Sequence, residues 1–208
     1  MSFRARDDIH LARRLWHFFG VMTMVVLYWI MTPQRAAIVC SAVSAFMILF
    51  DVCRLRSRRL NIFFTWLFGP FLRESERGRL AGSTFMMAGV TLCVWLYPKN
   101  VVLLTLLFFA VADPLASYFG IRYGKDKLVG NKSLQGSAAA FIACFVVAFA
   151  FFLTFDLMRE RLFLACLMSA LIGAVSELFP VWKLDDNFVF PVLGSTLLAG
   201  LFYIFGGL

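Results

Sequence analysis

The stretch Ala-Asp-Pro-Leu-Ala-Ser-Tyr-Phe-Gly-Ile-Arg-Tyr-Gly-Lys-Asp-Lys-Leu-Val-Gly-Asn-Lys-Ser-Leu-Gln-Gly-Ser, residues 112–137, decides how the rest of this chain is organised. It places Asp113 and Pro114 inside an otherwise apolar run, continues as a loop rich in glycine and lysine, and then returns to apolar sequence. Acids within membrane segments are rare and costly, and they usually mark functional sites. Asp113 is therefore the first candidate site residue.

The composition around this stretch is that of a polytopic membrane protein. The chain is 62% hydrophobic and 15% charged, whereas soluble domains are about 45–50% apolar and about 25% charged. The longest stretch between apolar runs, residues 54–79, is too short to fold as a separate soluble domain. We therefore expect residues 1–208 to form one integral-membrane domain.

The apolar runs predict an all-α fold with about seven transmembrane helices, because a crossing needs about 20 apolar residues. Their approximate ranges are 15–31, 36–53, 82–98, 101–120, 136–155, 162–180 and 188–206. A further apolar run at 60–72 is too short to span, so it is predicted to lie in the interface or to enter the membrane as a re-entrant segment. The alternative is a tight packing loop whose flanking arginines bind anionic lipid.

Lysines and arginines gather on one side of the predicted helices. Of the 20 in the chain, only Arg35, Lys99, Arg159 and Arg161 lie on the other side. The positive-inside rule then places the N-terminus in the cytoplasm and the C-terminus outside. The formal charge of +8 thus follows from membrane topology and does not indicate nucleic acid.

The acids follow the same division. Asp51, Asp113 and Glu177 sit toward the cytoplasmic ends of their predicted helices, and only Asp156 and Glu160 belong to the far side. Acids and bases therefore meet at one membrane surface. Binding of a polyanionic cytosolic ligand together with a divalent cation requires such an arrangement.

The predicted fourth helix contains an interruption. Pro114 removes one helical hydrogen bond and disfavours helical geometry at Asp113, which predicts a broken helix. Such a break is tolerated where it is buried in protein or lines a cavity. Asp113 and Ser117 are spaced i, i+4, so both can face that cavity. The structural alternative is that Asp113 pairs with an arginine or caps a helix half.

Stripes of small residues at four-residue spacing predict close packing of the fourth, fifth and sixth helices. The stripes are Ala112, Ala116 and Gly120, then Gly136, Ala140 and Cys144, and then Ala165, Ser169 and Gly173.

The loop after Asp113 favours phosphate binding. Gly120, Gly124 and Gly130 offer backbone amides, and Lys125, Lys127 and Lys132 offer ammonium groups. The spacing is not that of a Walker A loop, and no strand precedes it. The alternative is a basic connection on the cytoplasmic side.

Two further groups are candidates for the same site. Glu177 and the run Asp185-Asp186-Asn187 can bind Mg²⁺ together with nucleotide phosphates, although Asp186 or Asn187 can instead cap the last helix. Arg13, Arg14 and His17 lie at the start of the first helix, where a phosphate contact competes with interfacial snorkelling.

These residues together resemble the family of CTP-dependent lipid kinases, which includes dolichol kinase, phytol kinase and the CTP-using diacylglycerol kinase. Four blocks match in order. They are Arg13-Arg14-Leu-Trp-His17, then Arg73-Glu-Ser-Glu76 with Gly82-Ser-Thr-Phe85 and Gly89, then Asp113 to Ser137 with Asn131-Lys-Ser-Leu-Gln-Gly-Ser, and finally Glu177 with Asp185-Asp-Asn187. The chain departs from the family pattern at Pro114 and Gln135.

The resemblance implies transfer of the γ-phosphoryl group of CTP to the hydroxyl of a lipid alcohol such as diacylglycerol, a polyprenol or phytol, with Mg²⁺ as cofactor. It implies catalytic roles for Asp113, Glu177 and Asp186, and metal ligation by some of Asp113, Glu177, Asp185 and Asp186. Implied nucleotide-binding residues are Gly120, Gly124, Lys125, Lys127, Lys132, Ser133 and Gly136. Arg14, His17, Arg73, Glu76 and Asn187 are further candidates.

Two other activities compete with the kinase. A phosphatidate cytidylyltransferase shares part of the glycine- and lysine-rich block, but the chain lacks its His-Gly-Gly, Asp-Arg and Asp signature. A transporter is disfavoured because no internal repeat is evident and the charges gather at one face. The short chain fits a bacterial inner-membrane enzyme with its site facing the cytoplasm. The sequence leaves the lipid and the oligomeric state open.

Overall fold

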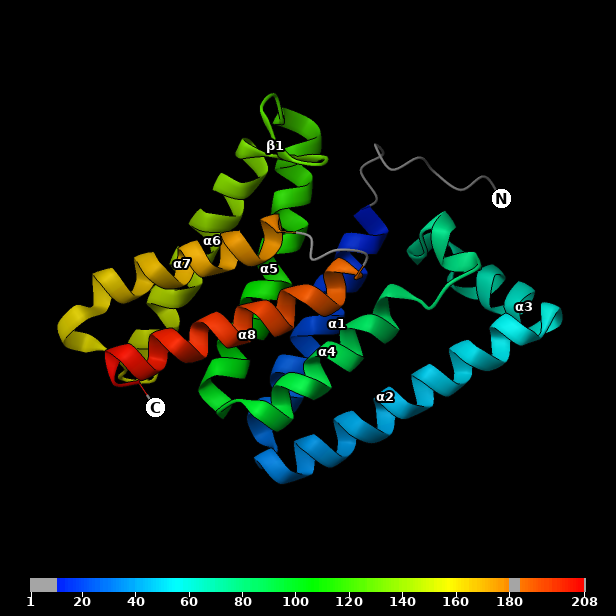
Figure 1. Ribbon diagram of the computed structural model, residues 1–208, viewed down its shortest axis with the longest axis horizontal. Coiled ribbons are helices and arrows are strands. Elements are labelled where there is room, and N and C mark those ends of the chain that lie inside the picture. The colour runs from blue at the N-terminus through cyan, green and yellow to red at the C-terminus, as the bar shows by residue number, and fades with distance from the viewer. Residues whose placement is uncertain (1–10, 180–183, 208) are drawn as a thin grey trace.

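The computed structural model describes residues 11–179 and 184–207, and it confirms an all-α fold (Figure 1). The long helices are α1 Leu11–Ile30, α2 Pro33–Arg56, α4 Gly82–Leu96, α5 Lys99–Tyr123, α6 Leu134–Thr154, α7 Leu162–Leu178 and α8 Asp186–Phe205. Shorter elements are α3 Arg58–Phe68 and the 3₁₀ turns η1 Gly69–Phe71, η2 Glu74–Arg77 and η3 Arg159–Arg161. A small antiparallel hairpin, β1 Lys127–Val129 and β2 Lys132–Ser133, joins α5 to α6.

Each of the seven predicted helices overlaps one observed long helix. Five candidate spans meet the length and hydropathy expected of a crossing, at α2, α5, α6, α8 and a segment that joins η3 to α7. Helix α4 has only 15 residues, and α1 carries Arg13, Arg14 and His17 in its first two turns. Seven spans and the orientation therefore stay predictions. Arg4, Arg6 and Lys183, which entered the charge count, lie outside the described residues.

Helix α5 corrects the expectation of a broken helix. It runs without interruption from Lys99 to Tyr123 with Pro114 inside it. Proline costs one backbone hydrogen bond to Ala110, but it does not force a break. Helices α1, α6 and α8 all pack along α5, and Phe108 and Phe109 are buried in the core. This packing keeps the helix continuous past the proline.

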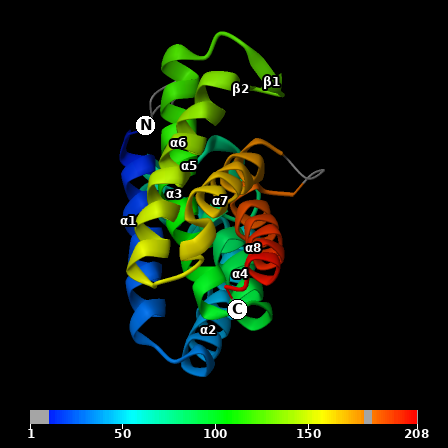
Figure 2. The same cartoon turned by 90° about the vertical axis from the view of Figure 1, so that its left-hand side faces the viewer.

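The predicted close packing of α5, α6 and α7 is confirmed. The small side chains of the three stripes are buried where these helices meet, among them Ala116, Ala140 and Ser169. An added Cβ on Gly136 would lie 2.6 Å from the Ala116 carbonyl oxygen, and one on Gly173 would lie 2.5 Å from the Cys144 sulfur. Figure 2 shows α5 and α6 side by side, with the hairpin at their upper end.

A buried ion pair fixes the segment between α3 and α4. Arg54 is 0% exposed and its guanidinium bonds the Asp51 carboxylate. The same guanidinium donates to Asn61 Oδ1 at 2.9 Å, to the Glu76 carbonyl at 3.2 Å and to the Arg79 carbonyl at 2.7 Å. All three acceptors lie outside α2. Two of them, the Glu76 and Arg79 carbonyls, are backbone groups of η2 and the following turn, so the Arg54 side chain supplies their hydrogen-bond donors.

The second oxygen of Asp51 holds the start of α4. It accepts hydrogen bonds from the Ala81 backbone nitrogen at 2.8 Å and from the Thr84 hydroxyl at 2.7 Å. The Arg54 guanidinium also lies over the Phe64 ring of α3, 4.4 Å from its centroid. The buried pair thus joins α2, α3, η2 and α4.

We expect Arg54→Met to lower the free energy of unfolding by about 3–5 kcal/mol, because Asp51 would remain as a buried charge without its partner. The measurement is unfolding of the purified protein in mixed micelles, followed by circular dichroism. Arg159→Met is the matched control, because Asp156 and Arg159 form a pair with the same spacing but with exposed side chains. Its loss should cost at most about 1 kcal/mol. Equal losses in the two variants would contradict the role given to Arg54.

Candidate active site

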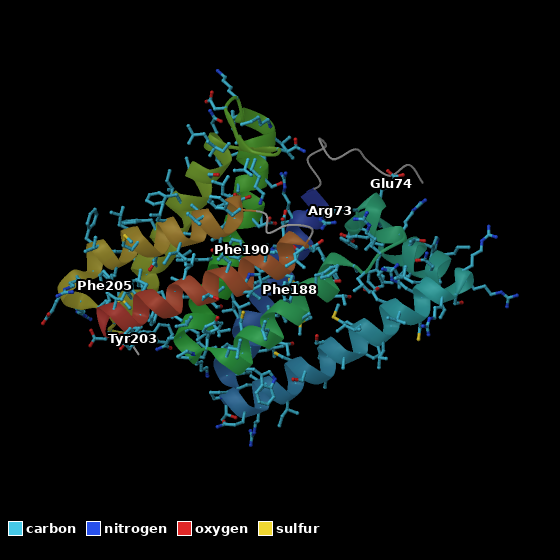
Figure 3. All side chains as sticks on the ribbon, in the orientation of Figure 1. Arg73, Glu74, Phe188, Phe190, Tyr203 and Phe205 are labelled. Carbon is cyan, nitrogen blue, oxygen red and sulfur yellow. The ribbon has the colours of Figure 1, made fainter. Side chains whose placement is uncertain are left out.

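A narrow crevice gathers charged residues from four elements at one end of the helices. Asp113 of α5, Lys132 of β2, Glu177 of α7 and Asp186 of α8 line it. Phe190 of α8 also lines it and stacks on the core residue Phe109, with ring centroids 4.9 Å apart. Figure 3 shows Phe188 and Phe190 near the start of α8, with Tyr203 and Phe205 at its far end. The crevice therefore lies where α7 ends and α8 begins, against the middle of α5.

Lys132 is the positive charge at the centre of this crevice. Its ammonium lies 2.9 Å from Glu177 Oε1 and 3.8 Å from Asp186 Oδ2, and it also donates to the Glu177 carbonyl. Glu177 is 8% exposed. Its Oε2 is a buried atom without a hydrogen-bond partner among the described residues. That oxygen is an unused acceptor, which suits a bound cation or a hydroxyl donor.

Asp113 stands apart from this ion pair. It is half-buried and forms no hydrogen bond or ion pair within residues 11–179 and 184–207. It is close enough to Arg13, Arg14 and Glu177 to interact with each electrostatically. Asp113 thus lies between the arginines of α1 and the carboxylate of α7, with its oxygens free.

The arginines of α1 reach the site from the opposite side. Arg13 pairs with the buried Glu76 at 3.2 Å and donates to the Phe71 carbonyl at 3.3 Å. Arg14 donates to the Ser117 hydroxyl at 3.0 Å and lies over the Tyr118 ring. Arg14 Nη1 has no partner among the described residues although it is buried. A buried guanidinium nitrogen without an acceptor suits a phosphate oxygen.

His17 lies one turn beyond Arg13 on α1. Its Nε2 is 3.2 Å from the Phe109 carbonyl of α5, and its ring packs edge-on against the Phe109 ring. Donation to this carbonyl requires the proton on Nε2. Phe109 precedes Ala110. In a regular helix the Ala110 carbonyl would accept a hydrogen bond from the backbone N–H of residue 114, but Pro114 has no N–H. His17 therefore joins α1 to α5 beside Pro114. The contact that the structure shows for His17 is thus one of helix packing.

Three polar residues stand at the start of α8. Asp185 and Asn187 have structural contacts, and Asp186 faces the crevice. Asp185 is the N-cap, and its Oδ1 accepts from the Asn187 backbone nitrogen at 3.0 Å. Helix capping was expected of Asp186 or Asn187, so this expectation is corrected by one position. Asn187 is buried against Gly82, where an added Cβ would lie 2.5 Å from its amide nitrogen. Asp186 is left to face Lys132.

The glycines of the loop have a packing role. An added Cβ on Gly124 would lie 2.2 Å from the Gly120 carbonyl oxygen, and one on Gly120 would lie 3.2 Å from Ser133 Oγ. Ser133 is buried and caps α6, accepting from the Gly136 backbone nitrogen at 3.2 Å. These residues bring α5, the hairpin and α6 together. Nothing in this packing tests their predicted contact with a nucleotide.

The three lysines of the loop point in different directions. Lys132 turns into the crevice, whereas Lys125 and Lys127 are exposed on the hairpin. Lys127 donates to the Asn131 carbonyl at 3.3 Å, across a turn where Gly130 has a φ of +57°. Arg73 is also exposed, and Figure 3 shows it next to Glu74 on the segment that leads into η2.

The carboxylates do not form a ready-made metal centre. Among the described residues, no three side chains of histidine, cysteine, aspartate or glutamate converge as a metal site. Mg²⁺ is usually held by only one or two carboxylates together with phosphate oxygens. The free Glu177 Oε2 and the neighbouring Asp113 and Asp186 fit that second pattern.

Sequence reasoning missed the role of Asp51, Arg54 and Asn61 in holding Glu76 near Arg13. The signal was present, because Asp51 and Arg54 are an acid and a base one turn apart near the end of an apolar helix. Their partners are backbone carbonyls of a loop, which residue types do not reveal.

The fold and site define a class, namely helical proteins with several candidate membrane spans and a crevice lined by both basic and acidic side chains. The sequence is 32% identical over 158 residues to CTP-dependent diacylglycerol kinase 1 of Schizosaccharomyces pombe, covering 71% of this chain and 72% of that protein. The chain belongs to the family of CTP-dependent lipid kinases, which confirms the resemblance seen in the four sequence blocks.

Other relatives agree with this membership. The protein of the same name from Saccharomyces cerevisiae is 28% identical over 182 residues, which cover 77% of this chain and 63% of that protein. An uncharacterized protein of Rickettsia prowazekii is 24% identical over 191 residues, covering 89% of this chain and 91% of that protein. No family model matches the sequence, and no solved structure gives a significant match.

We expect Gly136→Ala to destabilise the protein by about 1–3 kcal/mol, because its new Cβ must push the Ala116 carbonyl away and separate α5 from α6. The measurement is again unfolding in mixed micelles. Gly200→Ala in α8 is the control, because an added Cβ there meets nothing within 4 Å and alanine favours a helix. A neutral Gly136→Ala would show that α5 and α6 pack less closely than described.

Proposed function

We propose that this chain transfers the γ-phosphoryl group of CTP to the hydroxyl of a lipid alcohol. The observation that carries the proposal is the crevice in which Lys132 lies between Glu177 and Asp186, opposite Asp113, in a chain of this family. Phosphoryl transfer depends on positioning and charge neutralisation, and lysine, arginine and carboxylate groups provide both.

The basic residues are proposed to hold the phosphates. Lys132 is already in the crevice, and the unpartnered Arg14 Nη1 offers a second donor near Asp113. The hairpin lies beyond the ends of α5 and α6 (Figures 1 and 2). Lys127 begins it and Lys125 comes just before it, and both are exposed, so they can attract a polyanion from solution. On binding, the Lys132 ammonium exchanges part of its contact with the carboxylates for contact with phosphate oxygens.

Asp113 is proposed as the general base, because its oxygens are free while Glu177 and Asp186 face Lys132. In this step Asp113 takes the proton of the lipid hydroxyl, the hydroxyl oxygen bonds to the γ-phosphorus, and the bond from the γ-phosphorus to the β–γ bridging oxygen breaks. The products are a lipid phosphate and CDP. Its place between α1 and the crevice allows Asp113 to contact both substrates.

Mg²⁺ is the proposed cofactor. Glu177 through Oε2, with Asp113 or Asp186, would hold the ion together with phosphate oxygens. When bound, the ion neutralises charge on the phosphates. Asp185 is a weaker ligand candidate, because its Oδ1 already caps α8.

The membrane arrangement belongs to the same proposal. Seven helices, including the short α4, are proposed to span with the N-terminus in the cytoplasm, which puts the crevice at the cytoplasmic surface. Helix α3 exposes Ile62, Phe63 and Trp66 and is proposed to lie in the interface. In a bacterium this membrane is the inner membrane. The names of the relatives make diacylglycerol the first lipid alcohol to test, before polyprenols and phytol.

Incubation of the purified protein with Mg²⁺, diacylglycerol and CTP labelled either at the γ-phosphate or in the base tests the reaction directly. We expect the γ-label to appear in the lipid and the base label to remain in CDP. In a parallel incubation with phosphatidate in place of diacylglycerol, base label in the lipid would instead identify a cytidylyltransferase, because the phosphatidate oxygen would then have attacked the α-phosphorus of CTP and released pyrophosphate. No label in any lipid alcohol of a panel would leave transport or scaffolding as the function.

We expect Asp113→Asn and Lys132→Ala each to reduce transfer by at least about 100-fold, because loss of a general base or of charge stabilisation costs this much. The measurement is γ-label transfer by variants whose circular dichroism and micelle unfolding match the wild type. Asp156→Asn, on an exposed turn at the other end of α6, is the matched control. Wild-type turnover in either site variant would remove its assigned role.

A further inference from the structure

An apolar groove of about 450 Å³ lies between α1, α2 and α4. Its floor consists of buried side chains, with Met87, Val90 and Val94 from α4 and Leu106 from α5. Its walls come from α1 and α2. Figure 1 shows these two helices meeting at one end and diverging toward the other. Its volume falls within the range of about 300–1,000 Å³ found for small-molecule sites.

The wall formed by α1 is a single helix face. Trp16, Gly20, Thr23, Leu27 and Met31 line the groove at successive turns. Fifteen residues separate the first from the last, which is about 22 Å at 1.5 Å per residue. One leaflet of hydrocarbon is about 15 Å thick. The groove is thus long enough for a fully extended hydrocarbon chain that starts at the surface of one leaflet.

The two ends of the groove differ. At the end where α1 and α2 meet, the Lys99 ammonium donates to the Trp29 carbonyl at 2.7 Å and to the Met31 carbonyl at 2.8 Å. These bonds hold the turn between α1 and α2 and place one cation at that end. At the other end Trp16 stacks on Phe71, with ring centroids 4.8 Å apart. Arg13 and Arg14 lie within one turn of Trp16, and Asp113 interacts electrostatically with both of them, so a basic and an acidic group come together only at the Trp16 end of the described groove.

The Trp16 end of the groove lies toward the candidate active site. On α5, Leu106 in the groove floor is seven residues before Asp113, so both lie on one helix face about 10 Å apart along the axis. On α1, the first residue of the groove is Trp16, two positions after Arg14, which interacts electrostatically with Asp113. A hydrocarbon chain in the groove can therefore place a polar head group next to Asp113.

We infer that this groove binds one hydrocarbon chain of the lipid alcohol substrate, with the chain end toward Met31 and the hydroxyl at Asp113. The inference rests on the proposed function and adds to it a binding site for the apolar part of the substrate. The lining favours hydrocarbon, since it is almost entirely apolar and the Thr23 hydroxyl on the α1 wall already donates to the Phe19 carbonyl at 2.8 Å.

Gly20 makes the groove accessible to a precise test. An added Cβ at this position meets nothing within 4 Å, and Gly20 lines the groove, so a larger side chain here is expected to occupy part of the groove. Gly200 of α8 has the same open surroundings but does not line the groove. Gly20→Leu and Gly200→Leu are therefore a matched pair of helix substitutions.

We expect Gly20→Leu to raise the KM for long-chain diacylglycerol by at least about tenfold, because a misplaced methylene in an apolar pocket already costs this much. The KM for CTP should not change, and the loss should be smaller for short-chain diacylglycerols, which do not reach the position. Gly200→Leu should match the wild type. Val43→Phe, which narrows the groove from α2, provides a second blocking variant should Gly20→Leu fold poorly. Wild-type KM values for every lipid in both blocking variants would overturn the inference.

Photolabelling separates this inference from the proposed function. A diacylglycerol with a diazirine near the end of one chain is expected to label peptides of α1, α2 and α4, and less so in Gly20→Leu. Unlabelled diacylglycerol should compete, whereas phosphatidylcholine should not. Equal competition by phosphatidylcholine would mean that ordinary bilayer lipid fills the groove, and it would overturn the inference. A wild-type protein that labels as expected but transfers no phosphoryl group would refute the kinase and keep the groove as a lipid-alcohol site.

Discussion

The buried ion pair between Asp51 and Arg54 is the constraint on which the site depends. These two side chains hold the segment before α4 by its backbone. Glu76 is thereby placed against Arg13 of α1, and Gly82 against Asn187 of α8. Breaking a buried pair is costly because the remaining charge has no compensation. A contact deep in α2 therefore determines where two distant helix ends meet.

A second constraint comes from backbone contacts in α5, the hairpin and α6. Gly124 of the predicted phosphate loop and Gly136, which the family resemblance implied in nucleotide binding, have no space for a side chain, because carbonyl oxygens lie 2.2 Å and 2.6 Å from where a Cβ would be. Gly120 has little space, with Ser133 Oγ at 3.2 Å. Close approach of α5 and α6 sets the direction of the hairpin. That direction points Lys132 at Glu177. Packing and charge placement are thus two effects of the same glycines.

The sequence predicted the helices well, because long apolar runs and charged connections reflect burial and solvation directly. It also predicted that Asp113, Glu177 and Asp186 lie close together, although Asp113 lies near the middle of α5 while Glu177 is at the end of α7 and Asp186 at the start of α8. It failed where tertiary contacts decide between local alternatives. Helix α5 stays intact at Pro114 because neighbouring helices support it. Asp185, rather than Asp186, caps α8, because the helix begins at Asp186 and the residue before the first helical residue is the one that caps it.

Helix α1 is tied down at both ends. Lys99 bonds the Trp29 and Met31 carbonyls at one end. At the other end Arg13 bonds Glu76, Arg14 bonds Ser117 and Trp16 stacks on Phe71. Because a helix has a fixed rise per residue, α1 acts as a spacer that sets the distance between the Lys99 turn and the two arginines beside Asp113.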